Sequence, residues 1–334
     1  MVGKNNQYLK TTKEGTRVES YSIKKFKVGT ASVVIGASIF FGAGAVQAAE
    51  EVSNNTTVDN TDATETSIAL SKAKIHLKYS NLADNETRDR VKNALAKAGL
   101  SEDKINKFFE AVDEYNNAVG SKNLVQEMTS IEAAFPTFDQ DKLIDAWLNN
   151  NQGFVGRNCR ITSYSLMGDF IKVGNKTPGD TTMLFNDFAA IDAKKIFEGE
   201  DKEKFDTIFS YIDVNNTHDT NELADEIVKS WNDKQISFDN DKMHMISVFM
   251  TMDDGKNAVQ EFIGHTGVLV NDGDKYLFIE KLAFELPYQV DEFDNLQDVN
   301  DYLMGYYDND AEGLTAKPII FEDNHVMKEY RVLK

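Results

Sequence analysis

The sequence contains few of the residues that cross-link a chain or interrupt its regular structure. It has one cysteine and four prolines in 334 residues. A single cysteine excludes an internal disulfide framework and a zinc site built on paired cysteines. The 41% hydrophobic and 27% charged fractions argue against a disordered protein, and the length is ample for one or two cored domains.

Positive charge is also scarce. Lys and Arg number 36 against 55 Asp and Glu, which gives a formal net charge of −19. So acidic a chain is not expected to bind nucleic acid, and an anionic membrane or cell wall should repel it. The acidic balance otherwise indicates little beyond solubility.

The N-terminus has the pattern of a targeting segment. Lys24, Lys25 and Lys27 precede an uncharged stretch from Val28 to Ala49. Small residues near Ala48 provide a signal-peptidase site, so we expect residues 1–48 to be a signal peptide and no stable membrane association after cleavage. An uncleaved anchor is the alternative, because this stretch is long enough to span a bilayer.

Residues 21–32, YSIKKFKVGTAS, resemble the YSIRK/GS signal of surface and secreted proteins of Gram-positive cocci, with Lys24 in place of the usual arginine. The resemblance implies a secreted, extracellular protein. Many proteins with this signal also carry a C-terminal LPxTG sorting sequence, which is not present in the ending Glu329 to Lys334. We therefore expect release, or loose retention at the cell surface.

After the signal, polar composition predicts a disordered tether at residues 49–70. A helical N-terminal lobe is expected at 71–150 and a catalytic lobe at 151–334. Helices followed by an antiparallel sheet indicate the α+β class. The helices are expected at 84–98, 101–120, from 139, from Cys159 to a stop at Gly174, through most of 175–234 and at 294–303. The strands are expected at 75–79, 243–252, 264–281, 317–322 and 326–333.

The stretch 264–281, GHTGVLVNDGDKYLFIEK, reads as a β-hairpin. A two-residue Asp272-Gly273 loop would place His265 directly opposite Glu280. Side chains opposite each other across a hairpin share a face and lie about 5 Å apart at Cβ. An imidazole beside a carboxylate is half of a catalytic triad, and the single cysteine, Cys159, would be the nucleophile.

Cys159 follows Asn158, which is a good N-cap, so the thiol would lie at the first turn of a helix. The positive end of the helix dipole favours the reactive thiolate. Arg157 and Arg160 would add to that field, and they are the candidate substrate-binding residues.

A cysteine at a helix start, a histidine on a strand and a carboxylate on the next strand resemble the papain-like superfamily, including NlpC-type and CHAP amidases. The resemblance implies a papain-like fold in which Cys159 is the nucleophile, His265 the general base and Glu280 the orienting group. It also implies an oxyanion hole formed by the Cys159 backbone N–H and a side chain, either Gln152 or Asn158. Glu285 and Gln289 are alternatives for the orienting role.

Asn-Cys-Arg at 158–160 with Gly-His-Thr-Gly at 264–267 also resembles a family of secreted Gram-positive proteins described as a domain of unknown function. That resemblance supplies no activity.

We therefore expect a secreted cysteine hydrolase, a peptidase or amidase, that needs no cofactor and acts on a peptide, a protein or a small amide. A transglutaminase or acyltransferase would use the same residues. A non-catalytic binding or adhesion protein is a further alternative, and the oligomeric state stays open. No metal is expected, because the calcium-like series from Asp213 to Asp219 has His218 where glycine is needed.

Overall fold

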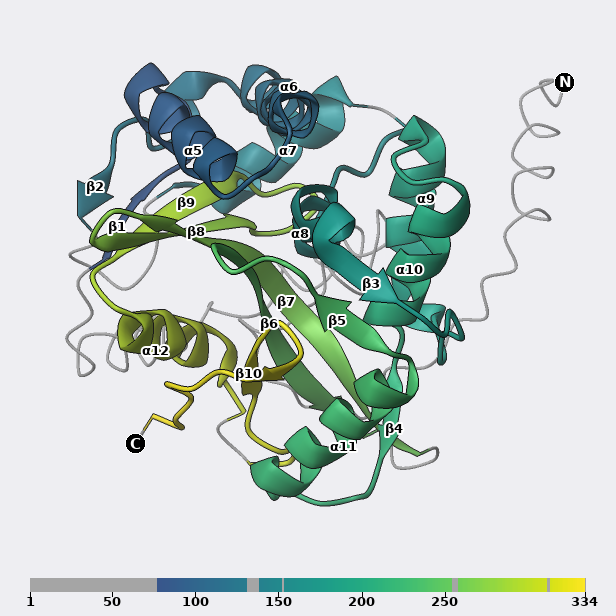
Figure 1. The fold of residues 1–334 in the computed structure, drawn as a ribbon. Helices are drawn as coiled ribbons and strands as arrows, with labels where there is room; N and C mark the ends of the chain where they lie inside the picture. The colour runs from purple at the N-terminus through teal and green to yellow at the C-terminus, as the bar shows by residue number, and fades with distance from the viewer. Residues whose placement is uncertain (1–76, 131–137, 152, 254–257, 311–312, 334) are drawn as a thin grey trace, which may run out of the picture.

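The computed structural model describes residues 77–130, 138–151, 153–253, 258–310 and 313–333. Within them the chain forms eight α-helices around a large antiparallel sheet (Figure 1), so the α+β class is confirmed. The predicted signal peptide, and the tether at 49–70, lie outside the described residues.

The main sheet has nine strands, with β11-β10-β6-β7-β8-β9-β1-β2 in order and β4 paired to one end of β7. A separate pair is formed by β3 and β5. The longest strands, β6 and β7, lie near the middle. The bounds are β1 Leu77–Ser80, β2 Thr129–Ser130, β3 Ile171–Val173, β4 Ile212–Val214, β5 Ile236–Phe238, β6 Met243–Met252, β7 Val259–Asp272, β8 Lys275–Lys281, β9 Tyr288–Phe293, β10 Ile319–Glu322 and β11 His325–Val326.

Both faces of the sheet are buried. Along β8, Leu277 and Ile279 belong to one core cluster, whereas Phe278 between them belongs to another. This alternation follows from the two-residue period of a strand. Because both faces are covered, a polar side chain on either face of β8 is taken into the interior.

The helices divide between these two faces. α5, α6 and α7 lie together on one side of β8 and β9, and α12 lies on the other (Figure 1). The bounds are α5 Asn85–Lys97, α6 Glu102–Val119, α7 Gln140–Asn150, α8 Cys159–Met167, α9 Phe185–Lys194, α10 Gly199–Phe209, α11 Thr220–Asp233 and α12 Leu296–Tyr307.

Local capping signals located the helix starts. The side chains of Asp84, Ser101, Asp139 and Asn158 each accept a hydrogen bond from a first-turn backbone N–H. These bonds satisfy N–H groups that have no partner inside the helix. The predicted starts of α5, α6, α7 and α8 are confirmed.

Three predicted elements were wrong in extent. The helix from Cys159 ends at Met167, and Ile171–Val173 is a strand instead of a helical turn. The stretch 175–234 is interrupted by β4, which places Ile212 in the main sheet. The last predicted strand shortens to β11, because only His325–Val326 finds a pairing partner.

Other differences reflect pairing that is distant in sequence. β9 had not been predicted, and it lies between β8 and β1. β1 belongs to the stretch expected to form a separate helical lobe, yet it pairs with β9 in the main sheet. One core cluster also contains residues from both expected lobes, from Leu82 to Phe321.

Candidate active site

Cys159 is the first residue of α8, as predicted. The Asn158 side chain accepts a hydrogen bond from the Ile161 backbone N–H at 3.0 Å and so caps the helix. α8 packs against β7 and β8. The sulfur is therefore held at the helix N-terminus beside the strands that carry His265 and Glu280.

A β-bulge turns His265 toward the α12 face. Val248 pairs with His265 and Phe249 pairs with Ile263, so Gly264 is the extra residue on β7. Ile263 consequently stays on the sheet face that α5 to α7 cover. His265, the next residue in register, points to the face that α12 covers. A Cβ at Gly264 would lie 2.3 Å from the Met250 sulfur, so a larger residue in the bulge would require the Met250 side chain to move.

The hairpin register differs from the predicted one by two residues. The turn is Gly273-Asp274, and Gly267 rather than His265 lies opposite Glu280. Only Gly273 has positive φ, as a type II′ turn with glycine in first place requires, whereas the predicted Asp-Gly loop needs positive φ at both positions. A slip of two keeps each side chain on its face, so His265 and Glu280 still meet.

The structure brings the three predicted side chains together. Nε2 of His265 lies 2.5 Å from Oε2 of Glu280. The Cys159 thiol interacts with the same imidazole, and Nδ1 is the ring nitrogen left for it because Nε2 is bonded to Glu280. β8 pairs with β7 only as far as Gly267, which leaves β7 unpaired on that side where α8 begins.

The electrostatics favour a charged cysteine–histidine pair. Burial raises the pKa of Cys159, but its hydrogen bond and attraction to His265 outweigh that effect, and the net shift is downward. Burial lowers the pKa of His265, but the bonds to Cys159 and Glu280 raise it to about 9. Near neutral pH the arrangement therefore favours a thiolate beside an imidazolium.

Glu280 is fixed by groups from β9 and α12. Its Oε1 accepts hydrogen bonds from Tyr302 Oη at 2.7 Å and from Gln289 Nε2 at 3.3 Å. Burial raises the pKa of Glu280, but the bond from His265 and the other donors bring it below its usual value. Tyr307 stacks on the His265 ring, with centroids 4.8 Å apart.

Residues 78–327 of the chain match the domain of unknown function DUF4300. The chain belongs to the DUF4300 family. The match includes Cys159, His265 and Glu280, and it states no activity for them. Residues 17–41 match the YSIRK type signal peptide, which indicates secretion. No curated protein and no solved structure matches the chain.

The described part of this DUF4300 chain contains neither a membrane-spanning helix nor a metal-binding cluster. None of its helices there is long and apolar enough to cross a membrane. The same residues contain no group of three or more His, Cys, Asp or Glu side chains placed to hold a metal ion.

Arg160 occupies a different place from the one expected. It is fully buried and forms two hydrogen bonds to Asp187, at 2.9 and 2.7 Å, and a third to the Ile263 carbonyl at 3.2 Å. We therefore assign Arg160 to anchoring α8 on α9 and β7 instead of contacting substrate. Arg157 is half-buried and pairs with Glu114 at 2.8 Å.

The candidate oxyanion groups have separate outcomes. Gln152 lies outside the described residues. The Asn158 side chain is buried, and besides capping α8 it donates from Nδ2 to Asp187 at 2.8 Å. Its amide is thus engaged in holding the loop that precedes the nucleophile. The Cys159 backbone N–H is at the helix start, where N–H groups have no intrahelical acceptor.

The two alternatives for the residue that orients His265, Gln289 and Glu285, lie in different places. Gln289 does contact Glu280, but as a donor behind it. Glu285 lies in the loop after β8, where burial raises its pKa, and no hydrogen bond joins it to His265 in the described structure. Tyr302 and Tyr307 were not anticipated: the helix had been expected to end at residue 303, before Tyr307, and no local pattern connects Tyr302 with Glu280. The alternation of polar and apolar residues in YQVDEF would have been the signal for β9.

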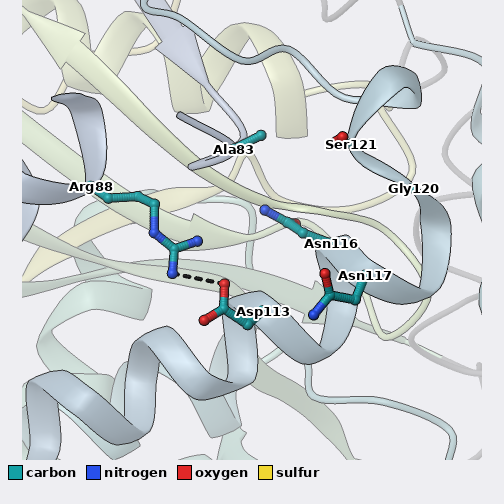
Figure 2. Close-up of a pocket in the computed structure, with 7 residues that line it drawn as sticks. All are labelled: Ala83, Arg88, Asp113, Asn116, Asn117, Gly120 and Ser121. Carbon is teal, nitrogen blue, oxygen red and sulfur yellow. Dashed lines mark ion pairs between the residues drawn. The ribbon is translucent and has the colours of Figure 1, made fainter. Parts of the chain in front are cut away.

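The site is closed in this structure. Cys159, His265 and Glu280 are each 1% exposed. A surface depression of about 360 Å³ lies elsewhere, between the start of α5 and the end of α6, and the Arg88–Asp113 ion pair crosses it (Figure 2). None of the residues that line it belongs to the candidate site. Access to the thiol therefore requires movement of the side chains around it.

Proposed function

We propose that this protein is a secreted cysteine hydrolase, a peptidase or amidase of papain-like design. The observation that carries the proposal is the convergence of a thiol at a helix N-terminus, an imidazole and a buried carboxylate. These are a nucleophile, a base and a group that orients the base, which is the combination that acyl transfer requires.

The chemistry would proceed in two balanced steps. The Cys159 thiolate attacks the amide carbonyl carbon, and the C–N bond breaks as the His265 imidazolium gives its proton to the leaving amine. Water then attacks the thioester, His265 takes its proton, and the carboxylic acid leaves as the C–S bond breaks and the thiolate–imidazolium pair reforms. The Cys159 backbone N–H would stabilise the oxyanion in both steps.

Glu280 would keep the imidazole oriented through both steps. Its bond to Nε2 fixes the ring so that Nδ1 faces the sulfur. Its charge also stabilises the imidazolium in the resting ion pair. A transglutaminase or acyltransferase would follow the same first step, with an amine or another acceptor in place of water.

Alkylation tests the proposal directly because Cys159 is the only cysteine. We expect the folded protein to react with iodoacetamide well below pH 8, and His265→Gln to remove this low-pH reactivity. His325→Gln is a matched control, because His325 is exposed on β11. A thiol that reacts only after denaturation would overturn the enzyme proposal and favour a binding protein.

Turnover provides the second test. Cys159→Ala should abolish hydrolysis in a screen of peptide and small-amide substrates and leave the thermal unfolding midpoint close to that of the wild type. Cys159→Ser is the conservative comparison, since its hydroxyl is a much weaker nucleophile at the same pH. Equal hydrolysis by wild type and Cys159→Ala would show that the activity resides elsewhere.

A further inference from the structure

A second buried carboxyl lies directly behind Glu280. Asp291 is on β9, two residues from Gln289, the residue that pairs with Glu280. It is fully buried, and it lies beside Glu280, because Gln289 Nε2 donates to both carboxyls, to Asp291 Oδ1 at 2.9 Å and to Glu280 Oε1 at 3.3 Å. Among the described residues, no donor reaches Asp291 Oδ2.

Two ionised carboxylates cannot hydrogen-bond, because both only accept. Two buried carboxyls that share one amide donor would also repel each other if both were ionised, so one of them holds a proton, and the donors decide which residue carries it. Glu280 receives bonds from His265, Tyr302 and Gln289, all of which stabilise its negative charge. Asp291 receives one, so the proton belongs on Asp291, whose otherwise unpartnered Oδ2 then becomes a donor.

The titration directions agree with this assignment. Burial raises the pKa of Asp291 well above its usual range, and the charge of Glu280 raises it further. The pKa of Glu280 shifts the opposite way. Environments that separate the pKa values of two adjacent carboxyl groups give them different roles.

We infer that Asp291 is a positioning residue, a neutral acid that donates a hydrogen bond to Glu280 and thereby fixes the carboxylate that orients His265. The inference rests on the proposed function of the cysteine–histidine pair. It gives the buried cluster one negative charge on Glu280, opposite the imidazolium, where two would repel each other. It also makes Asp291 necessary as a donor and not as an anion.

Other titratable groups face this carboxyl pair. Tyr302, Tyr306 and Tyr307 of α12 interact electrostatically with both acids, and burial raises the pKa of all three. They therefore remain neutral over the pH range of interest. His265 from β7 and the Cys159 sulfur complete the set.

Two substitutions separate a donor from an anion. Asp291→Asn is neutral and still donates through its amide, whereas Asp291→Ala does neither. We expect the pH profile of Cys159 alkylation in Asp291→Asn to stay within about threefold of wild type. We expect Asp291→Ala to react at least tenfold more slowly near pH 6, because Glu280 is no longer fixed.

Infrared difference spectroscopy checks the proton itself, without a substrate. Wild type minus Asp291→Asn should show the C=O stretch of a protonated carboxylic acid at pH 8. The subtraction also cancels the remaining buried carboxyls, including Glu261 and Glu285, whose pKa values burial raises. This measurement keeps the inference testable should Asp291→Ala fail to fold.

The outcomes distinguish the two proposals. If the wild-type thiol shows no reactivity at low pH, the proposed function is wrong. The infrared band would still show whether Asp291 carries a proton. If the wild type is reactive, the inference is overturned by a missing band. It is equally overturned by Asp291→Ala behaving like wild type, or by Asp291→Asn losing as much reactivity as Asp291→Ala.

Discussion

Glu280 and Lys281 are neighbours on β8, and both are fully buried, on opposite faces of the sheet. Glu280 is held by side chains, those of His265, Tyr302 and Gln289. Lys281 is held by the backbone: its Nζ donates to the carbonyls of Ala283, at 2.6 Å, Phe284, at 3.2 Å, and Leu286.

The difference shows two uses of a buried ionisable group. A carboxylate bonded to an imidazole belongs to a network whose protons can move, which suits chemistry. The Lys281 amino group inside a ring of carbonyls fixes the loop after β8, which suits structure, and burial lowers its pKa well below the usual value. The rings of Tyr115 and Tyr288 also lie over Lys281 Nζ, at 4.4 and 5.1 Å. The loop after β8 packs closely against the loop that precedes Cys159, because a Cβ at Gly156 would lie 2.2 Å from the Phe284 carbonyl oxygen.

The largest expected effect is on the α12 face. Glu280→Gln should lower turnover about ten-thousand-fold, as losing the orienting carboxylate does in serine-protease triads. Turnover in wild type should fall as pH rises through about 9, because His265 then loses the proton that the leaving amine needs. Without the Glu280 charge, this alkaline limb should move to lower pH.

Glu285→Gln is the matched control, a second buried carboxyl that His265 does not contact. Its pH–rate profile should keep the wild-type alkaline limb. An alkaline limb at the same pH in Glu280→Gln would mean that Glu280 does not set the proton affinity of the imidazole.

The second-largest expected effect concerns Lys281, on the sheet face opposite to that of Glu280. Lys281→Met should lower the free energy of unfolding by about 3–4 kcal/mol, because the buried carbonyls of Ala283, Phe284 and Leu286 lose their common donor. Denaturant titration measures the loss. Lys229→Met, at an exposed site on α11, should change stability by less than about 0.5 kcal/mol. A loss as small as that for Lys281→Met would contradict the structural role.

Substitution of Glu261 should give the smallest of the three effects. It extends the comparison of Glu280 with Lys281 to a buried carboxylate that accepts few hydrogen bonds. Thr251 Oγ1 donates to its Oε1 at 2.5 Å, and none of the residues that the structure describes donates to Oε2. Burial raises its pKa to about 7, whereas the same group in the unfolded chain titrates near 4.3. Wild-type stability should therefore decline as pH rises from about 4.5 through 7.

Glu261→Gln should remove that decline. It should be up to about 3 kcal/mol more stable than wild type at pH 8 and similar to it at pH 5, since a pKa unit is worth about 1.4 kcal/mol. Thermal unfolding at both pH values measures the difference. An equal gain at pH 5 would show that packing, and not ionisation, is responsible.

Elements with local signals were predictable. The caps at Ser101 and Asn158 and the apolar run of β6 gave correct boundaries, because side chain and backbone interact within a few residues. The hairpin was found but misregistered by two, because the turn type depends on which residue takes positive φ. β4 was missed because it depends on a partner distant in the sequence, and β9 because its alternating pattern is short and it is completed by pairing with the distant β1.

The sequence by itself determined a secreted α+β chain with its sole thiol at a helix start and a histidine and a glutamate on one hairpin face. Only the tertiary structure decided that these groups meet. The bulge at Gly264 turns the imidazole, and the end of β8 pairing at Gly267 leaves room for α8. The tertiary structure also placed Asp291, Gln289 and Tyr302 behind Glu280 and sent Arg160 inward to Asp187. These are contacts between strands and helices far apart in the chain, and no local pattern of residue types encodes them.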